Sequence, residues 1–150
     1  MRKILIALAA ALIAVSCSKK EPETPQDGGI SSDVVSYIGT VSVDQNDGTV
    51  FTKDNVEVQI VAVGGNTVVD MRMLNVNFSA AMPIELDMTV PGISRKGKSI
   101  SGDNIVPIAM GGSFPRYTIT ALTGTVENQA ISFSMMCGDY PLSYSGARKQ

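Results

Sequence analysis

From Val34 to Ser145, apolar and polar residues alternate with a period of two. In the clearest window, Ile84 to Val90, four apolar side chains alternate with three polar ones. Such alternation is typical of a strand with one buried face and one face in water. The pattern recurs in Val56 to Ile60, Tyr117 to Ala121 and Ile131 to Cys137. No window of eleven or more residues in this part of the chain carries a sustained helical stripe. The pattern therefore predicts an all-β domain.

Residues that favour turns separate these windows. Asp44 to Gly48 and Gly64 to Asn66 suit tight hairpins, because Gly and Asn accept a positive φ. Further corners are expected at Pro91-Gly92, Arg95 to Lys98, Gly111 to Ser113, Val126 to Gln129 and Gly138-Asp139. About eight strands with short connections follow from this punctuation, which predicts an antiparallel meander.

Eight antiparallel strands with one apolar face can form a sandwich or a closed up-and-down barrel. Tyr37-Ile38-Gly39 near the start of the domain is echoed by Tyr144-Ser145-Gly146 near its end. If the first and last strands pair, the sheet has no free edges and the matching glycines lie side by side. The echo favours a single eight-stranded antiparallel up-and-down barrel.

The chain from 34 to 147 resembles the calycin-like, or lipocalin-like, β-barrel domain of lipid-anchored proteins of Gram-negative bacteria. The motifs that carry the resemblance are Tyr37-Ile38-Gly39, Asn75-Val76-Asn77-Phe78, Met82-Pro83-Ile84, Val90-Pro91-Gly92-Ile93, Tyr117-Thr118-Ile119-Thr120, Leu122-Thr123-Gly124, Gly138 and Tyr144-Ser145-Gly146. The resemblance implies a fold and a place in the cell envelope more than an activity.

The N-terminus reads as a secretory leader. Arg2 and Lys3 precede twelve residues without a polar side chain, too few for a spanning helix, which needs about 20. Ala14-Val15-Ser16-Cys17 then resembles the bacterial lipobox, in which small residues precede a cysteine that receives lipid and becomes the new N-terminus. We expect a lipoprotein signal peptide over 1–16 and lipidation of Cys17. The alternative is ordinary secretory cleavage nearby with an incidental Cys17.

Residues 17–33 are expected to form a lipidated flexible tether, since prolines, glycines and charged residues dominate and few side chains are apolar. The charged run after Cys17 is similar to signals that send some lipoproteins to the cell surface, although a plain linker would read the same way. The expected location is therefore the outer membrane, lipid-anchored, with the domain facing either the periplasm or the cell surface.

The composition of the chain argues against several classes of partner and site. The chain has 44% hydrophobic and 17% charged residues, as folded proteins do. Beyond the leader, ten Lys and Arg face fourteen Asp and Glu, a net charge of −4 that argues against a nucleic-acid partner. His is absent, so His-based triads cannot be built, and we expect no enzyme, cofactor or metal. Cys137, with Cys17 lipidated, is expected to be a buried core residue.

Three polar groups could carry chemistry, and each has a simpler interpretation. Glu85 and Asp87 share a strand face, but that face points away from the apolar one and so into solvent. The Asp44 to Gly48 loop lacks the spacing and the final Glu of a calcium loop and is expected to be a hairpin turn. Arg95 to Lys98 is a basic cluster that could attract an anion or could be a solvated loop.

Methionines suggest a ligand site. An eight-stranded barrel is just wide enough to be filled by side chains or to hold one small ligand, and flexible Met suits an adaptable apolar pocket. The candidate interior residues are Met71, Met73, Met88, Ile119, Phe133 and Met135. The expected function is a membrane-anchored module that binds a small apolar or amphiphilic ligand. The alternative is an envelope interaction protein with a filled barrel and a protein partner.

Overall fold

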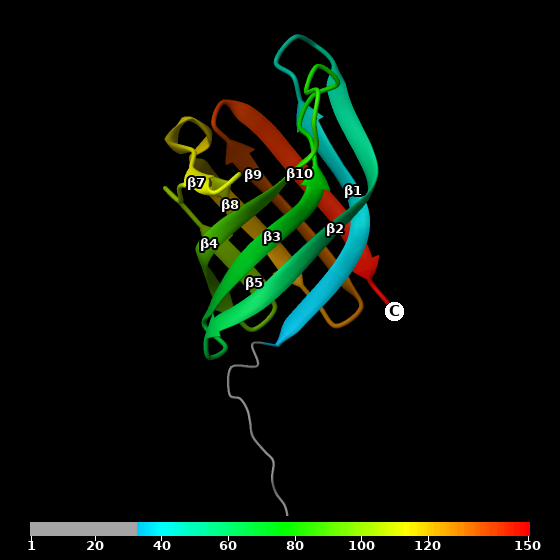
Figure 1. Ribbon diagram of the computed structural model, residues 1–150. Coiled ribbons are helices and arrows are strands. Elements are labelled where there is room, and N and C mark those ends of the chain that lie inside the picture. Colours follow the sequence, from blue (N-terminus) through cyan, green and yellow to red (C-terminus); the bar gives the residue numbers. More distant parts are fainter. Residues whose placement is uncertain (1–32) are drawn as a thin grey trace, which may run out of the picture. The chain divides into compact units, whose positions relative to one another are not determined.

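The computed structural model describes residues 33–150, so the predicted signal peptide, Cys17 and the tether up to residue 32 lie outside the described residues. Ten strands and one short 3₁₀ helix form this range (Figure 1). The strands are β1 (Val34–Asp44), β2 (Val50–Gly64), β3 (Val68–Val76), β4 (Leu86–Lys96), β5 (Ser99–Gly102), β6 (Ile108–Ala109), β7 (Gly112–Ser113), β8 (Ile119–Val126), β9 (Ala130–Cys137) and β10 (Tyr140–Arg148). The helix η2 spans Pro115–Tyr117. No helix within 33–150 is long and apolar enough to cross a membrane.

Eight of these strands close into an antiparallel barrel. The order β3-β2-β1-β10-β9-β8-β5-β4 is completed by pairing of β4 with β3, and β6 and β7 lie outside the ring as a hairpin on β4. The first strand pairs with the last, which confirms the predicted closure. The predicted eight-stranded barrel is therefore the observed fold, and its last strand ends one residue beyond the expected boundary at 147.

The seam between β1 and β10 explains the repeated Tyr and Gly. Gly39 lies directly opposite Gly146, and a Cβ at Gly39 would collide with the backbone oxygen of Ser145. The Tyr144 hydroxyl donates a hydrogen bond to the Val56 carbonyl (2.8 Å), and burial, followed by the negative charge of Glu57, raises the pKa of Tyr144. Small residues on the seam thus make room for a ring whose hydroxyl stays satisfied inside the barrel.

Bulges interrupt the ladders where the register shifts. Gly92 in β4, Asn75 in β3 and Ala121 in β8 have positive φ values of 70°, 52° and 52°. Their N–H groups donate to carboxylates on neighbouring segments: Gly92 to Asp70 (2.9 Å), Asn75 to Asp87 (2.8 Å) and Ala121 to Asp103 (3.1 Å). An aspartate therefore satisfies each amide that the bulge removes from the ladder.

Four details of the predicted strands are corrected, the first two by these bulges. Pro91-Gly92 is not a corner but a bulge inside β4, a position that tolerates a proline. Ala121 points outward because the bulge shifts the alternation, and Leu122 takes the buried position. Ile84 precedes β4 and is 52% exposed, whereas the apolar face begins at Leu86. Tyr117 belongs to η2 rather than to a strand.

Alternating residues of the eight ring strands fill the barrel interior. Val56, Val58 and Ile60 of β2 are buried, as are the four alternating residues Ile131, Phe133, Met135 and Cys137 of β9. No polar or charged residue in 33–150 belongs to the buried set. The interior is thus an apolar core, and any hollow in it must lie where strand side chains stop reaching one another.

Candidate functional site

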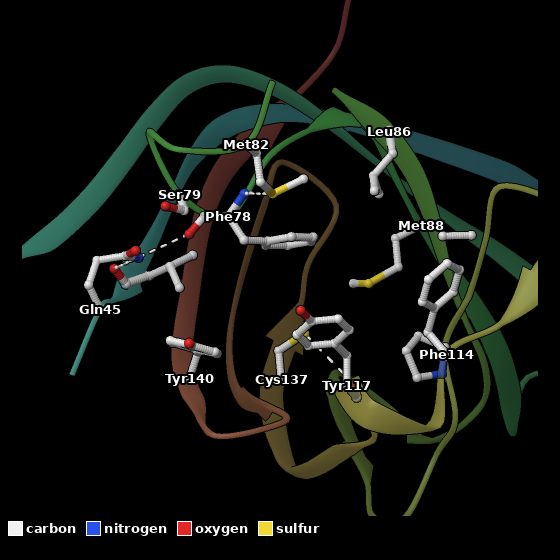
Figure 2. A pocket seen from close by; sticks show the side chains of 13 residues that line it. Gln45, Phe78, Ser79, Met82, Leu86, Met88, Phe114, Tyr117, Cys137 and Tyr140 are labelled. Carbon is white, nitrogen blue, oxygen red and sulfur yellow. Dashed lines mark hydrogen bonds between the residues drawn. The ribbon is translucent and has the colours of Figure 1, made fainter. Parts of the chain in front are cut away.

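One end of the barrel holds a cavity of about 340 Å³, which we call the mouth cavity (Figure 2). It lies at the end where β1 finishes, opposite the end where Val34 begins that strand. Its lining comprises Val43, Gln45, Phe78, Ser79, Met82, Leu86, Met88, Pro107, Ala109, Phe114, Tyr117, Cys137 and Tyr140. An engineered apolar cavity of about 150 Å³ holds one benzene, so this volume suits a ligand of roughly two such rings.

Strand residues form the base of the cavity. Val43 of β1, Met88 of β4, Ala109 of β6 and Cys137 of β9 are all buried. The Cys137 thiol points toward the Tyr117 carbonyl (Sγ to O, 3.9 Å), and burial raises the pKa of this thiol to about 11. The thiol therefore stays protonated at neutral pH, as expected of a core residue rather than a nucleophile.

The segment between β3 and β4 covers one side of the cavity. In Figure 2, Phe78 and Met82 lie above Tyr117 and Cys137, and Met88 lies to the right of both pairs. The Phe78 N–H donates to the Met82 sulfur (3.1 Å). Gln45 Nε2 donates to the carbonyls of both Val43 (3.0 Å) and Phe78 (2.9 Å). One amide directly after β1 thus ties this covering segment to the barrel.

The β6–β7 hairpin and η2 form the opposite wall. The Phe114 N–H donates to the Pro107 carbonyl (3.0 Å), and the Tyr117 N–H donates to the Phe114 carbonyl (3.0 Å). The Gly138 N–H donates to the Thr118 carbonyl (3.1 Å), which links η2 to the β9–β10 turn. These backbone bonds hold the rings of Phe114 and Tyr117 at the cavity, although both residues lie outside the strands.

No charged side chain is among the residues that line the mouth cavity, within the described range. Four of the thirteen lining residues carry aromatic rings, namely Phe78, Phe114, Tyr117 and Tyr140. Polar groups are limited to the Gln45 amide, the Ser79 hydroxyl, the two Tyr hydroxyls and the Cys137 thiol. Over 33–150, His, Cys, Asp and Glu form no group of three that could hold a metal ion. The arrangement suits apolar contact with a few neutral hydrogen bonds.

The six predicted interior residues are all buried, but they do not form one site. Met88 lines the mouth cavity, whereas the other five fill the barrel and are at most 4% exposed. Phe133, for example, stacks on Tyr144 with ring centroids 5.3 Å apart. We call these five residues the packed interior: Met71, Met73, Ile119, Phe133 and Met135.

Most of the residues that line the cavity were not predicted from the sequence. Phe78, Met82, Phe114 and Tyr140 belong to none of the predicted interior positions. Three of them lie in loops, where no alternation indicates which way a side chain faces. The available signal was the clustering of aromatic residues and Met in connecting segments, which are ordinarily polar.

The polar candidates have structural roles on the outer surface. Glu85 is exposed and pairs with Lys53, and exposed Asp87 accepts the hydrogen bond of the Asn75 bulge. Asp44 accepts the N–H of Asn46 (2.8 Å) within a hairpin turn, as expected for that loop. In the basic cluster, Lys98 pairs with Glu127 (3.4 Å) across exposed surface, and such pairs contribute at most about 1 kcal/mol.

Comparison of the chain with protein-family models, curated proteins and solved structures finds no match.

Proposed function

We propose that this protein is a lipid-anchored binding module that holds a small apolar or amphiphilic ligand in the mouth cavity. The observation that supports this proposal most strongly is the mouth cavity, which has a volume of about 340 Å³ and is lined mainly by apolar and aromatic side chains. Ligand sites of about 300–1,000 Å³ with this kind of lining are typical of small-molecule binders. No catalytic step is proposed, because the cavity brings together no acid, base or activated nucleophile.

A calycin-like assignment for the barrel is part of this proposal. It is supported by the closed ring of eight antiparallel strands with the first and last strands paired, together with the Tyr and Gly motifs on that seam. Fold similarity to ligand carriers is an analogy and gives no ligand by itself. The cavity supplies the independent support.

The anchor is the second part of the proposal, and it rests on the Ala14-Val15-Ser16-Cys17 pattern. We propose that lipid on Cys17 holds the protein at the outer membrane, with the barrel in the periplasm or at the cell surface. Two or three acyl chains give stable anchoring, since each buried methylene contributes about 0.8 kcal/mol.

The packed interior favours a second candidate function. Met71, Met73 and Ile119 are each 0% exposed, so the middle of the barrel offers no room to a ligand. A barrel that is filled throughout would work through its loops as an envelope interaction protein. The two candidates differ in whether the mouth cavity binds small molecules, and binding can be measured directly.

For the binding experiment we would use the chain from Ser18 to Gln150, which retains every residue of the barrel. We expect the fluorescence of the neutral probe N-phenyl-1-naphthylamine to rise on binding, and organic extracts of the purified protein to be enriched in a small molecule. Ala109→Phe should abolish probe binding because the ring fills the cavity, while Ala130→Phe, on an exposed site away from it, should not. Absence of both probe binding and an enriched molecule would favour the interaction protein.

Lipidation is tested separately on the full chain in cells. We expect labelled palmitate to enter the wild type and Cys137→Ala but not Cys17→Ala, since Cys137 is a buried residue of the barrel. Label in Cys17→Ala would contradict the anchor. Protease treatment of intact cells then distinguishes a barrel at the surface from one in the periplasm.

A further inference from the structure

Three exposed aspartates lie at the end of β1, in the β1–β2 turn and in the β9–β10 turn, all at the mouth end of the barrel; we call Asp44, Asp47 and Asp139 the acidic rim. Asp44 lies between two lining residues of the chain, and Asp139 directly precedes Tyr140, which also lines the cavity. The Asn46 side chain donates to the Asp139 carbonyl (2.8 Å), so the β1–β2 and β9–β10 turns lie together. Hydrogen bonds from Thr49 lower the pKa of Asp47, which keeps that carboxylate ionised at neutral pH.

The mouth end of the barrel has fewer unpaired cationic side chains than the acidic rim has carboxylates. Lys53 is paired with Glu85, which borders the covering segment, so this pair adds no net charge. The Arg116 guanidinium lies 5.7 Å from the centre of the Tyr117 ring and forms no salt bridge with residues 33–150. The three carboxylates of the acidic rim outnumber this one unpaired guanidinium, so these groups together carry a net negative charge.

The uncharged lining of the cavity limits which ligand groups can be buried inside it. A ligand carboxylate inside it would meet no cationic side chain, because the lining is uncharged. The best-placed amide, Gln45 Nε2, already donates both of its hydrogens to backbone carbonyls. An ionised group buried without a partner costs several kcal/mol, so the ionised form of a ligand head group is excluded from the interior.

We propose that the mouth cavity selects ligands whose buried part is uncharged, and that the acidic rim discriminates against anionic ligands such as fatty-acid carboxylates in favour of neutral or cationic ones. This inference rests on the proposed function and names the ligand class of the same site. It differs from simple apolar binding in predicting that two ligands with the same chain and different head groups bind differently.

The test uses three eight-carbon ligands that differ in charge at pH 7.4: octanol, octanoate and octylammonium. Each is titrated against the Ser18 to Gln150 chain carrying N-phenyl-1-naphthylamine, and displacement of the probe gives its affinity. We expect octanoate to bind about tenfold more weakly than octanol or octylammonium. Added salt should narrow the part of this gap that comes from the exposed rim.

Substitutions at the rim isolate its contribution. Asp44→Asn and Asp139→Asn remove charge while keeping a side chain of similar shape, and each should tighten octanoate binding by about threefold without changing octanol binding. Asp33→Asn is the matched control, because this exposed aspartate precedes β1 at the opposite end of the barrel. The control should alter neither affinity.

The outcomes separate this inference from the function on which it rests. If octanoate binds as tightly as octanol, the charge selection is wrong although the cavity binds ligands. If, in addition, Arg116→Gln weakens octanoate alone, the entrance is an anion site, which overturns the proposal. If none of the three ligands displaces the probe and the probe itself fails to bind, the binding function is wrong and the selection falls with it.

Discussion

The packed interior and the mouth cavity lie in one barrel but are built differently. In the packed interior, residues such as Met71 and Met73 come from regular strands and leave no accessible surface. At the mouth, strands supply the base and Tyr140, and segments between strands supply Phe78, Met82, Phe114 and Tyr117. The same flexible methionines therefore fill space in one region and border a hollow in the other.

The sizes of the strand side chains account for the difference. Away from the mouth cavity, Tyr37 and Tyr144 bring large buried rings inward, and both hydroxyls donate to main-chain carbonyls at 2.8 Å. At the mouth, three of the six lining residues that belong to strands, Val43, Ala109 and Cys137, have short side chains. Phe78, Phe114 and Tyr117, from segments between strands, add aromatic rings to the lining around this space.

The largest expected effect is at the barrel seam. Gly39→Ala places a Cβ against the backbone of Ser145 and Gly146, which no rotamer change can relieve. We expect a loss of about 4 kcal/mol in the free energy of unfolding, or failure to fold. Gly112→Ala is the control in the β6–β7 hairpin, where a Cβ meets nothing within 4 Å. Urea unfolding of both variants measures the difference, and equal stabilities would contradict the tight seam.

The second-largest expected effect is the loss of stability when a methionine is truncated, and it should differ between the packed interior and the mouth cavity. Met73→Ala opens a hole in the packed interior and should lower the free energy of unfolding by about 3 kcal/mol. Met88→Ala enlarges a cavity that already exists and should cost about half as much, while it changes the affinity for N-phenyl-1-naphthylamine. A larger cost for Met88→Ala than for Met73→Ala would show that the mouth is as tightly packed as the interior.

Alkaline pH tests whether the base of the cavity is dry. The Cys137 thiol has a pKa of about 11 in the folded protein against 9.0 ordinarily, because burial disfavours the thiolate. Between these values the unfolded chain releases a proton that the folded chain retains, so stability falls as pH rises from 9 to 11. The loss attributable to this thiol is about 2 kcal/mol.

The control is Cys137→Ser, which cannot titrate in this range and should show a shallower decline of stability with pH. The tyrosines contribute equally to both proteins, so they cancel in the difference. Identical slopes for the wild type and Cys137→Ser would mean that water reaches the thiol freely.

The smallest expected effect concerns two tyrosines of β10. Tyr144→Phe leaves the buried Val56 carbonyl without its hydroxyl donor and should cost about 1–2 kcal/mol. Tyr140→Phe should change stability by less than about 0.5 kcal/mol, since Tyr140 is 38% exposed at the mouth. Thermal unfolding of the two variants gives this comparison, and a greater loss for Tyr140→Phe would contradict it.

Period-two alternation was sufficient to predict the strands, because burial of one strand face imposes that pattern along β2 and β9, and the repeated Tyr and Gly motif then favoured the barrel over a sandwich. The pairing of Gly39 with Gly146 was also foreseeable from the repeated Tyr and Gly motif. The alternation failed at Ala121, where an extra residue enters β8 and the Asp103 carboxylate binds the freed amide. Such a bulge depends on a partner distant in sequence, so local pattern does not show it.

The mouth cavity was less predictable than the barrel, because its position also depends on residues that are distant in sequence. Burial of Met71, Met73 and Met135 was correctly expected, but alternation cannot tell a filled position from one that borders a hollow. Phe78 reaches the cavity because Gln45, 33 residues earlier in the chain, holds its carbonyl. Packing and long-range hydrogen bonds therefore decide where the cavity lies, and neither has a periodic signature.

The most direct test of the account uses the methionine methyl groups as reporters. In ¹H–¹³C NMR spectra of methyl-labelled Ser18 to Gln150 chain, addition of octanol should shift the Met82 and Met88 signals, which line the mouth cavity. The Met71 and Met73 signals of the packed interior should stay in place. Shifts confined to Met82 and Met88 are the predicted result. No shift at either, or equal shifts at Met71 and Met73, would contradict a ligand site at the mouth of a filled barrel.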